Sequence, residues 1–75
     1  MFGITLDTRT IQHLKDTYKP GTRIRLIHMN DSQAPMDGAE GSVVHVDDIG
    51  TIHMRWDNGS SLGLVYGEDS FEIVR

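Results

Sequence analysis

The sequence predicts a mainly β fold in which one short N-terminal helix precedes five short strands. Two observations carry this prediction. Apolar residues recur every three or four positions before Pro20 and at alternate positions after it, and these are the periods of a helix and of a half-buried strand. Turn-forming residues then separate the strand-like segments, and no apolar run is long enough to span a membrane.

A short helix is expected between residues 6 and 21, LDTRTIQHLKDTYKPG. Asp7 or Thr8 can cap its first turn, and Pro20 ends it because proline cannot continue a helix. At about ten residues such a helix is marginal in water. We therefore expect it to dock on its own domain, with a partner-binding helix as the alternative. The stripe available for docking consists of Ile11, Leu14 and Tyr18.

Five strands are expected after the helix because apolar and polar side chains alternate there between turn residues. Their expected ranges are 22–29, 42–46, 51–56, 61–65 and 71–74. Residues 30–41, NDSQAPMDGAEG, show no period and form a loop too long for a tight turn. A loop of this length in a compact domain is often functional.

The first hairpin turn is expected at Asp48 and Ile49, with Gly50 in the left-handed conformation. This register puts apolar side chains on one face of the sheet and polar ones on the other. Its cross-strand pairs are Val46 with Ile52, Val44 with Met54, His45 with His53, and Val43 with Arg55.

The second hairpin is expected to turn through a three-residue loop, 57–59, with Gly59 as the left-handed residue. A two-residue turn would instead pair Leu62 with Arg55 and mix the two faces. The three-residue loop pairs Trp56 with Ser60, Met54 with Leu62, and Ile52 with Leu64. The expected core then contains Ile24, Leu26, Val44, Val46, Ile52, Met54, Leu62, Leu64, Phe71 and Ile73.

Five short strands, a long first loop and two tight hairpins are typical of a small SH3-like barrel. Residues 67–70, GEDS, stand where such barrels commonly carry one 3₁₀ turn before the last strand. Closure of the sheet would also remove exposed strand edges. We therefore expect an N-terminal helical segment, residues 1–19, followed by an SH3-like β-barrel, residues 20–75.

Two stretches, YKPGTRIRLIHMND and EGSVVHVDDIGTIHMRWDNGSSLGLVYGEDSFE, resemble the DUF4314 family, small domains of unassigned function in Firmicutes and their phages. The resemblance spans about residues 18–73 and leaves the helix outside it. It implies an SH3-like fold and a phage or mobile-element setting. It implies no catalytic residues.

The composition of the chain argues against several classes of function. Seven Lys and Arg against eleven Asp and Glu give a formal net charge of -4, which argues against nonspecific binding of nucleic acid. The absence of cysteine excludes disulfides and thiolate chemistry and fits a reducing cytoplasm. The N-terminus, MFGITLDTRT, has no signal-peptide pattern. We expect neither a membrane partner nor a cofactor.

Metal binding and catalysis are the weaker alternatives. His45, His53 and Asp47 would offer a metal three ligands, but no HExxH or compact cluster surrounds them. Asp47 belongs to a turn, where Asp is favoured for backbone hydrogen bonding. Ser60 and Ser61 lack a nucleophile motif. We therefore predict no metal site, no catalytic residue and no enzyme activity.

Two surfaces are expected to bind instead. A polar stripe that also includes Val43 is expected on the outer face of the strands. It suits an anion or a nucleotide, because an arginine guanidinium group can donate two hydrogen bonds to one phosphate and an aromatic ring can stack on a base. Its expected ligand-binding residues are Arg23, Arg25, His45, His53, Arg55 and Tyr66. The long loop would bind a partner through Met29, Asn30, Met36 and Trp56. For Trp56, closing the end of the core is the alternative.

We expect a non-enzymatic binding protein of phage or prophage type, acting in the cytoplasm of the bacterial host cell. The phage setting follows from the resemblance, and phages use such compact proteins to counter host defence, by blocking a host protein or sequestering a nucleotide signal. A nucleotide site would lie at a subunit interface because one barrel is too small to enclose it, so we expect a homo-oligomer. The alternative is an SH3-like protein-interaction or nucleic-acid-associated module.

Overall fold

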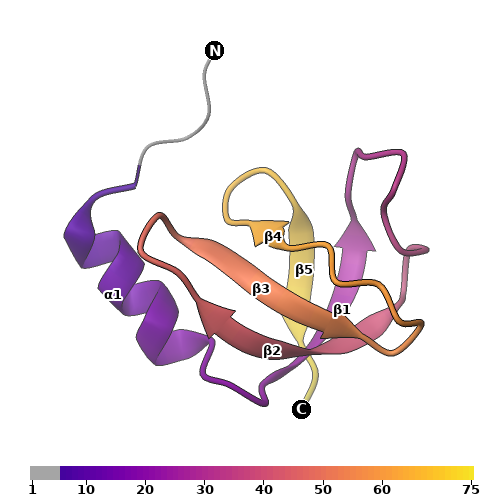
Figure 1. Cartoon of the computed structure of the whole chain (residues 1–75), viewed down its shortest axis with the longest axis horizontal. Coiled ribbons are helices and arrows are strands. Elements are labelled where there is room, and N and C mark those ends of the chain that lie inside the picture. The colour runs from indigo at the N-terminus through magenta and orange to yellow at the C-terminus, as the bar shows by residue number, and fades with distance from the viewer. Residues whose placement is uncertain (1–5) are drawn as a thin grey trace.

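The computed structural model describes residues 6–75 as one helix followed by five strands in a single antiparallel sheet (Figure 1). The strand order is β4-β3-β2-β1-β5, so the first four strands form a meander and the last returns beside the first. The elements are α1 (Thr8–Thr17), β1 (Arg23–His28), β2 (Glu40–Val46), β3 (Thr51–Trp56), β4 (Leu64–Val65) and β5 (Ser70–Ile73). The prediction of a mainly β fold with one helix and five strands is confirmed.

The sheet is not closed into the expected barrel. β4 and β5 are its two edges, and within residues 6–75 no strand ladder joins them. One reason is the length of β4, which consists of only Leu64 and Val65. The chain then enters a tight turn, in which the Val65 amide donates to Asp69 Oδ2 over 2.8 Å. This turn contains Gly67 and no 3₁₀ helix, so the expectation for residues 67–70 was wrong.

The helix begins where the sequence predicts and docks on its own sheet. Asp7 is the N-cap, and its Oδ1 accepts a hydrogen bond from the Thr10 amide over 2.7 Å. The chain leaves the helix at Tyr18, three residues before Gly21, which has a φ of 91°. Leu14 is fully buried and α1 lies alongside β2 (Figure 1). The helix and the sheet therefore share one core.

Both hairpin turns have the predicted geometry. Gly50 and Gly59 have φ values of 90° and 94°, the left-handed region that glycine adopts without steric cost. In the second hairpin the Trp56 amide donates to the Ser60 carbonyl over 2.9 Å. The same register pairs Ile52 with Leu64. The three-residue loop is thus confirmed.

A β-bulge changes the predicted register within β2. His45 lies opposite His53 as expected, but Val43 rather than Val44 lies opposite Met54. Val44 is the additional residue of the bulge, and an extra residue reverses the facing of all residues before it. Val43 is therefore 3% exposed and Val44 41% exposed, the opposite of the prediction. The residue opposite Arg55 is Ser42, not Val43.

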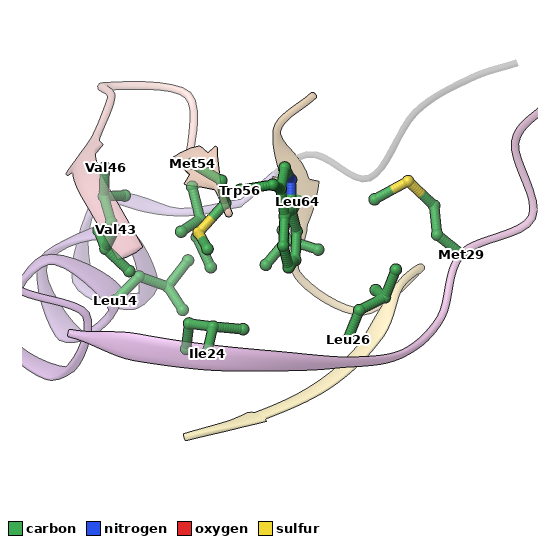
Figure 2. Packing of buried hydrophobic residues seen from close by; sticks show 10 residues of the cluster. Leu14, Ile24, Leu26, Met29, Val43, Val46, Met54, Trp56 and Leu64 are labelled. Atoms are coloured by element: carbon green, nitrogen blue, oxygen red, sulfur yellow. The ribbon is translucent and has the colours of Figure 1, made fainter. Parts of the chain in front are cut away.

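The core is a continuous cluster between the sheet and the helix (Figure 2). Figure 2 shows Leu14 of α1 inserted between Val43 and Ile24. The expected core residues Leu62, Phe71 and Ile73 are only partly buried and pack against the cluster's edge. Its buried members are Leu14, Ile24, Leu26, Met29, Val43, Val46, Ile52, Met54, Trp56 and Leu64. Among the described residues no helix has the length and apolarity needed to cross a membrane.

Candidate binding surfaces

The outer face of the sheet carries five of the six predicted ligand-binding residues and divides into two parts. The first, here called the ion-pair cluster, consists of Arg23, Arg25, Glu40, Asp57 and Glu72. The second, here called the histidine-arginine patch, consists of His45, His53, Arg55, Ser60 and Ser61. The two parts differ in how their charges are compensated.

In the ion-pair cluster, Arg23 is held by a two-pronged contact with Asp57. Its Nη2 lies 2.6 Å from Asp57 Oδ2 and its Nη1 donates to Oδ1 over 3.0 Å. Nη1 also donates to Ser42 Oγ over 2.9 Å. The hydrogen bonds from Arg23 lower the pKa of the Asp57 carboxyl below its ordinary value.

Arg25 is paired in the same way with two further carboxylates. Its Nη1 lies 2.9 Å from Glu72 Oε2 and its Nη2 lies 3.2 Å from Glu40 Oε2. Glu40 also approaches Arg23, at 3.7 Å. Three carboxylates therefore surround two guanidinium groups. The charges of Arg23 and Arg25, both predicted as ligand contacts, are therefore compensated by neighbouring carboxylates.

In the histidine-arginine patch, the His53 side chain is fixed by Asp47. His53 Nε2 lies 2.7 Å from Asp47 Oδ2, and Asp47 Oδ1 also accepts from the amides of Ile49 and Thr51, over 3.1 and 2.9 Å. Partial burial raises the pKa of Asp47, but these hydrogen bonds outweigh it and leave the pKa below its ordinary value. An ionised carboxylate only accepts hydrogen bonds, so the proton of the contact is on His53 Nε2.

His45 stacks on His53 instead of joining it around an ion. The two ring centroids are 4.4 Å apart and the ring planes differ by 9°. Within residues 6–75 there is no group of three or more His, Cys, Asp or Glu side chains arranged to hold a metal. The arrangement is a stacked pair of rings on the outer face, and His53 of this pair is hydrogen-bonded to Asp47.

Arg55 is exposed between Ser42 on one neighbouring strand and Ser61 on the next chain segment. Ser42 is its partner on β2, and the register that joins Trp56 to Ser60 and Ile52 to Leu64 places Ser61 opposite it on the other side. No ion pair of Arg55 occurs among residues 6–75. Beside it lies an open depression lined by Gln33, Thr51, His53, Ser60, Ser61, Leu62 and Gly63.

A second concavity, here called the aromatic concavity, lies between the end of α1, β1 and the turn before β5. Tyr18 and Phe71 meet edge to face, with ring centroids 5.6 Å apart and an interplanar angle of 64°. Ile27 and Tyr66 also line it and are 51% and 42% exposed. Burial, followed by the neighbouring Tyr66, raises the pKa of Tyr18. Gly67, Asp69 and Ser70 complete the lining.

The aromatic concavity was not predicted from the sequence. Tyr66 was expected beside the polar stripe, but it lies in this concavity, whose lining contains none of the predicted arginines or histidines. Tyr18 and Phe71 were interpreted as docking and core residues. The available signal was Ile27, an apolar residue that strict alternation with Ile24 and Leu26 places on the outer face.

The four residues predicted to bind a partner through the long loop are divided between core and surface. Met29 and Trp56 are 7% and 1% exposed and belong to the core, and Trp56 Nε1 donates to the Leu62 carbonyl over 2.8 Å. The alternative interpretation of Trp56, closure of the core, matches this position. Asn30 is exposed and Met36 is 83% exposed, so both are accessible to a partner.

A family model described as a domain of unknown function (DUF4314) matches residues 7–74. The match confirms the resemblance seen in the sequence and extends it to the helix, which had been left outside. No curated protein and no solved structure matches the chain.

Proposed function

The chain belongs to the DUF4314 family, and we propose that it is a non-enzymatic binding module whose ligand is a partner protein held in the aromatic concavity. The observation that carries this proposal is the gathering of Tyr18, Ile27, Tyr66 and Phe71 around one open hollow. Apolar and aromatic side chains that meet in an accessible concavity are the usual anchors of protein interfaces.

The physical support comes from rigidity as well as exposure. Tyrosine rings offer large contact area at low cost in side-chain entropy, because only two torsions are immobilised. Tyr18 is held by its edge-to-face contact with Phe71, and Ile27 lies on β1 between Leu26 and His28, which both pair with β5. The concavity is thus preformed by a helix end, a strand and a short turn, which reduces the cost of binding.

We further propose that the open sheet is an SH3-like module that closes only partly. The support is the strand order, a four-stranded meander with β5 returning to β1. A phage or prophage setting, a cytoplasmic location in the host and a homo-oligomeric state remain part of the proposal. In that setting the concavity would block a host protein, as a counter-defence protein of this size would do.

The absence of catalysis is also proposed, and the contacts around His53 support it. Asp47 and His53 form an acid-histidine pair, but the Ser60 hydroxyl oxygen is engaged by the Leu62 amide at 3.3 Å. Among residues 6–75 neither Ser60 nor Ser61 hydrogen-bonds to the histidine. A serine nucleophile requires such a contact with its base.

The test is affinity capture from host lysate with four proteins that differ by single substitutions. We expect wild type and Met36→Ser to retain the same partner, and Tyr66→Ala and Ile27→Ser to lose it. Met36→Ser is the matched control because it removes an even more exposed apolar side chain from the long loop. If Met36→Ser alone lost the partner, the interface would lie in the long loop that contains Met36, and the proposal would be overturned.

The nucleic-acid-associated alternative has less support. The formal charge of -4 opposes a polyanion, and the carboxylates of the ion-pair cluster neutralise Arg23 and Arg25. A strand of RNA or DNA laid across the outer face would meet these acids.

A further inference from the structure

We propose that the histidine-arginine patch is a second binding site, which takes a single phosphate group such as that of a nucleoside monophosphate. The site is separate from the aromatic concavity and does not depend on the proposed function. His53 and Ser61 line the depression beside β3. Arg55 is not part of this lining, but it follows His53 by two residues on the same strand and lies opposite Ser61 in the register.

Arg55 supplies the charge. It is an exposed arginine on the outer face that, among the described residues, has no carboxylate partner, whereas Arg23 and Arg25 are both paired. A guanidinium group presents parallel N–H donors that match two phosphate oxygens. On β2 its cross-strand neighbour is Ser42, whose hydroxyl oxygen accepts a hydrogen bond from Arg23, so the adjacent position adds no opposing charge.

His53 contributes a fixed and partly free ring. Its Nε2 is occupied by Asp47, and Nδ1 has no hydrogen bond within residues 6–75. Stacking on His45 holds the plane of the ring, so Nδ1 is oriented before any ligand arrives. This nitrogen accepts from a phosphate or sugar hydroxyl, and it donates to a phosphate oxygen when the ring is protonated.

Gly63 lines the depression and lets its chain segment pack closely against β3. A Cβ at this position would lie 2.9 Å from Thr51 Cγ2 and 3.3 Å from the Ile52 carbonyl oxygen. The Ser61 hydroxyl and the Gln33 amide border the same hollow, and neither side chain hydrogen-bonds to another residue among 6–75. These groups offer further donors to a polar ligand.

The surrounding charges limit the size of the ligand. Asp57 follows Arg55 by two residues on the same face, and Glu40 lies on the adjacent strand. One phosphate group can bind Arg55 without reaching these acids, but a polyphosphate chain or a nucleic acid strand would be repelled by them. The geometry therefore favours a small monoanion or dianion.

Titration of ¹⁵N-labelled protein with inorganic phosphate and with AMP, at constant ionic strength, tests the site. We expect saturable amide shifts at residues 51–55 and 60–63, and about tenfold weaker binding in Arg55→Gln. Arg25→Gln is the matched control, since it removes an outer-face arginine that is already paired. It should bind as wild type does.

The two probes separate the source of the phosphate. Tighter binding of AMP, with additional shifts at Gln33, would show that the nucleoside is also recognised. Equal binding would show a site for the phosphate group alone, and both results support the proposal. Absence of saturable shifts with both probes, or equal weakening by Arg55→Gln and Arg25→Gln, would overturn it. Neither result bears on the aromatic concavity, whose residues are different.

Discussion

The ion-pair cluster and the histidine-arginine patch occupy one face of the same sheet but are in opposite electrostatic states. Around Arg25 the cross-strand positions are Glu40 on one side and Glu72 on the other. Around Arg55 the cross-strand residue on β2 is Ser42, and Ser61 is aligned on the far side. Strand pairing therefore separates Arg25 from Arg55, whereas Arg23, which also faces Ser42, is paired by Asp57 from the second hairpin loop.

This difference concerns how the charge of each arginine is compensated. Exposed ion pairs contribute little to stability, because the charges are well solvated before they meet. Their main effect here is to cancel the charge of Arg23 and Arg25. In the part of the chain that the structure describes, both arginines of the first half are therefore paired with carboxylates, whereas Arg55 in the second half is not.

The largest expected effect comes from the core that supports both halves. Trp56→Ala should lower the free energy of unfolding by about 3–5 kcal/mol, because it leaves a cavity under β3. Urea denaturation followed by circular dichroism measures it, with Met36→Ala as an exposed control expected within about 0.5 kcal/mol. If Trp56 instead served mainly to bind a partner, the substitution would leave stability unchanged.

Asp47→Asn should have an intermediate effect, confined to the patch. Loss of the carboxylate weakens its hydrogen bonds to His53 and to two turn amides, and we expect a cost of about 1–2 kcal/mol in urea denaturation. The pKa of Asp47 is lowered by folding from its ordinary value of 3.8. Its contribution is therefore complete above that value and is lost as the pH falls through the folded-state pKa.

The control for this prediction is the free energy of unfolding measured as a function of pH in the acid range. Asp47→Asn should be closest to wild type in stability at the lowest pH and furthest from it near neutrality. A difference that stays constant across this range would show that the carboxylate's charge does not contribute.

A smaller effect is expected from Arg23→Gln in the ion-pair cluster. The melting temperature should fall slightly at low salt and hardly at all at high salt, because the pair with Asp57 is exposed and screened. A double-mutant cycle with Asp57→Asn isolates the pair. Additive losses in the cycle would mean that the two side chains do not interact in solution.

The smallest effect on stability should come from converting the patch into a second ion-paired region. Ser61→Asp places a carboxylate opposite Arg55 and should change stability by about 0.2–1 kcal/mol at most. Phosphate binding, measured by the same amide shifts, should nevertheless disappear, while Ser61→Asn, which keeps a hydrogen-bond donor and adds no charge, should weaken it far less. Retained binding in Ser61→Asp would show that an unpaired arginine is not what defines the patch.

Much of the local structure was predictable because it depends on nearest neighbours in the chain. Asp7 as the N-cap and Gly50 and Gly59 in the two hairpins follow from backbone chemistry. The cross-strand pairing of His45 with His53 followed from the first hairpin turn, whereas the stacking of their rings was not predicted. The bulge at Val44 did not, because Val43 and Val44 are equally apolar in the sequence and only the folded structure shows that Val43 is the one buried in the core.

By itself, the sequence determined the helix, the five strands, both hairpin turns and the polarity of the outer face. These features arise from periodicity, capping and turn preference, which act over a few residues. Tertiary structure alone decided that the sheet stays open, that Trp56 is buried, that Tyr18 and Tyr66 share one hollow, and that carboxylates surround Arg23 and Arg25 but not Arg55. The reason is that these outcomes depend on which strands become neighbours, and residues such as Arg25 and Glu72 are far apart in the chain until β5 pairs with β1.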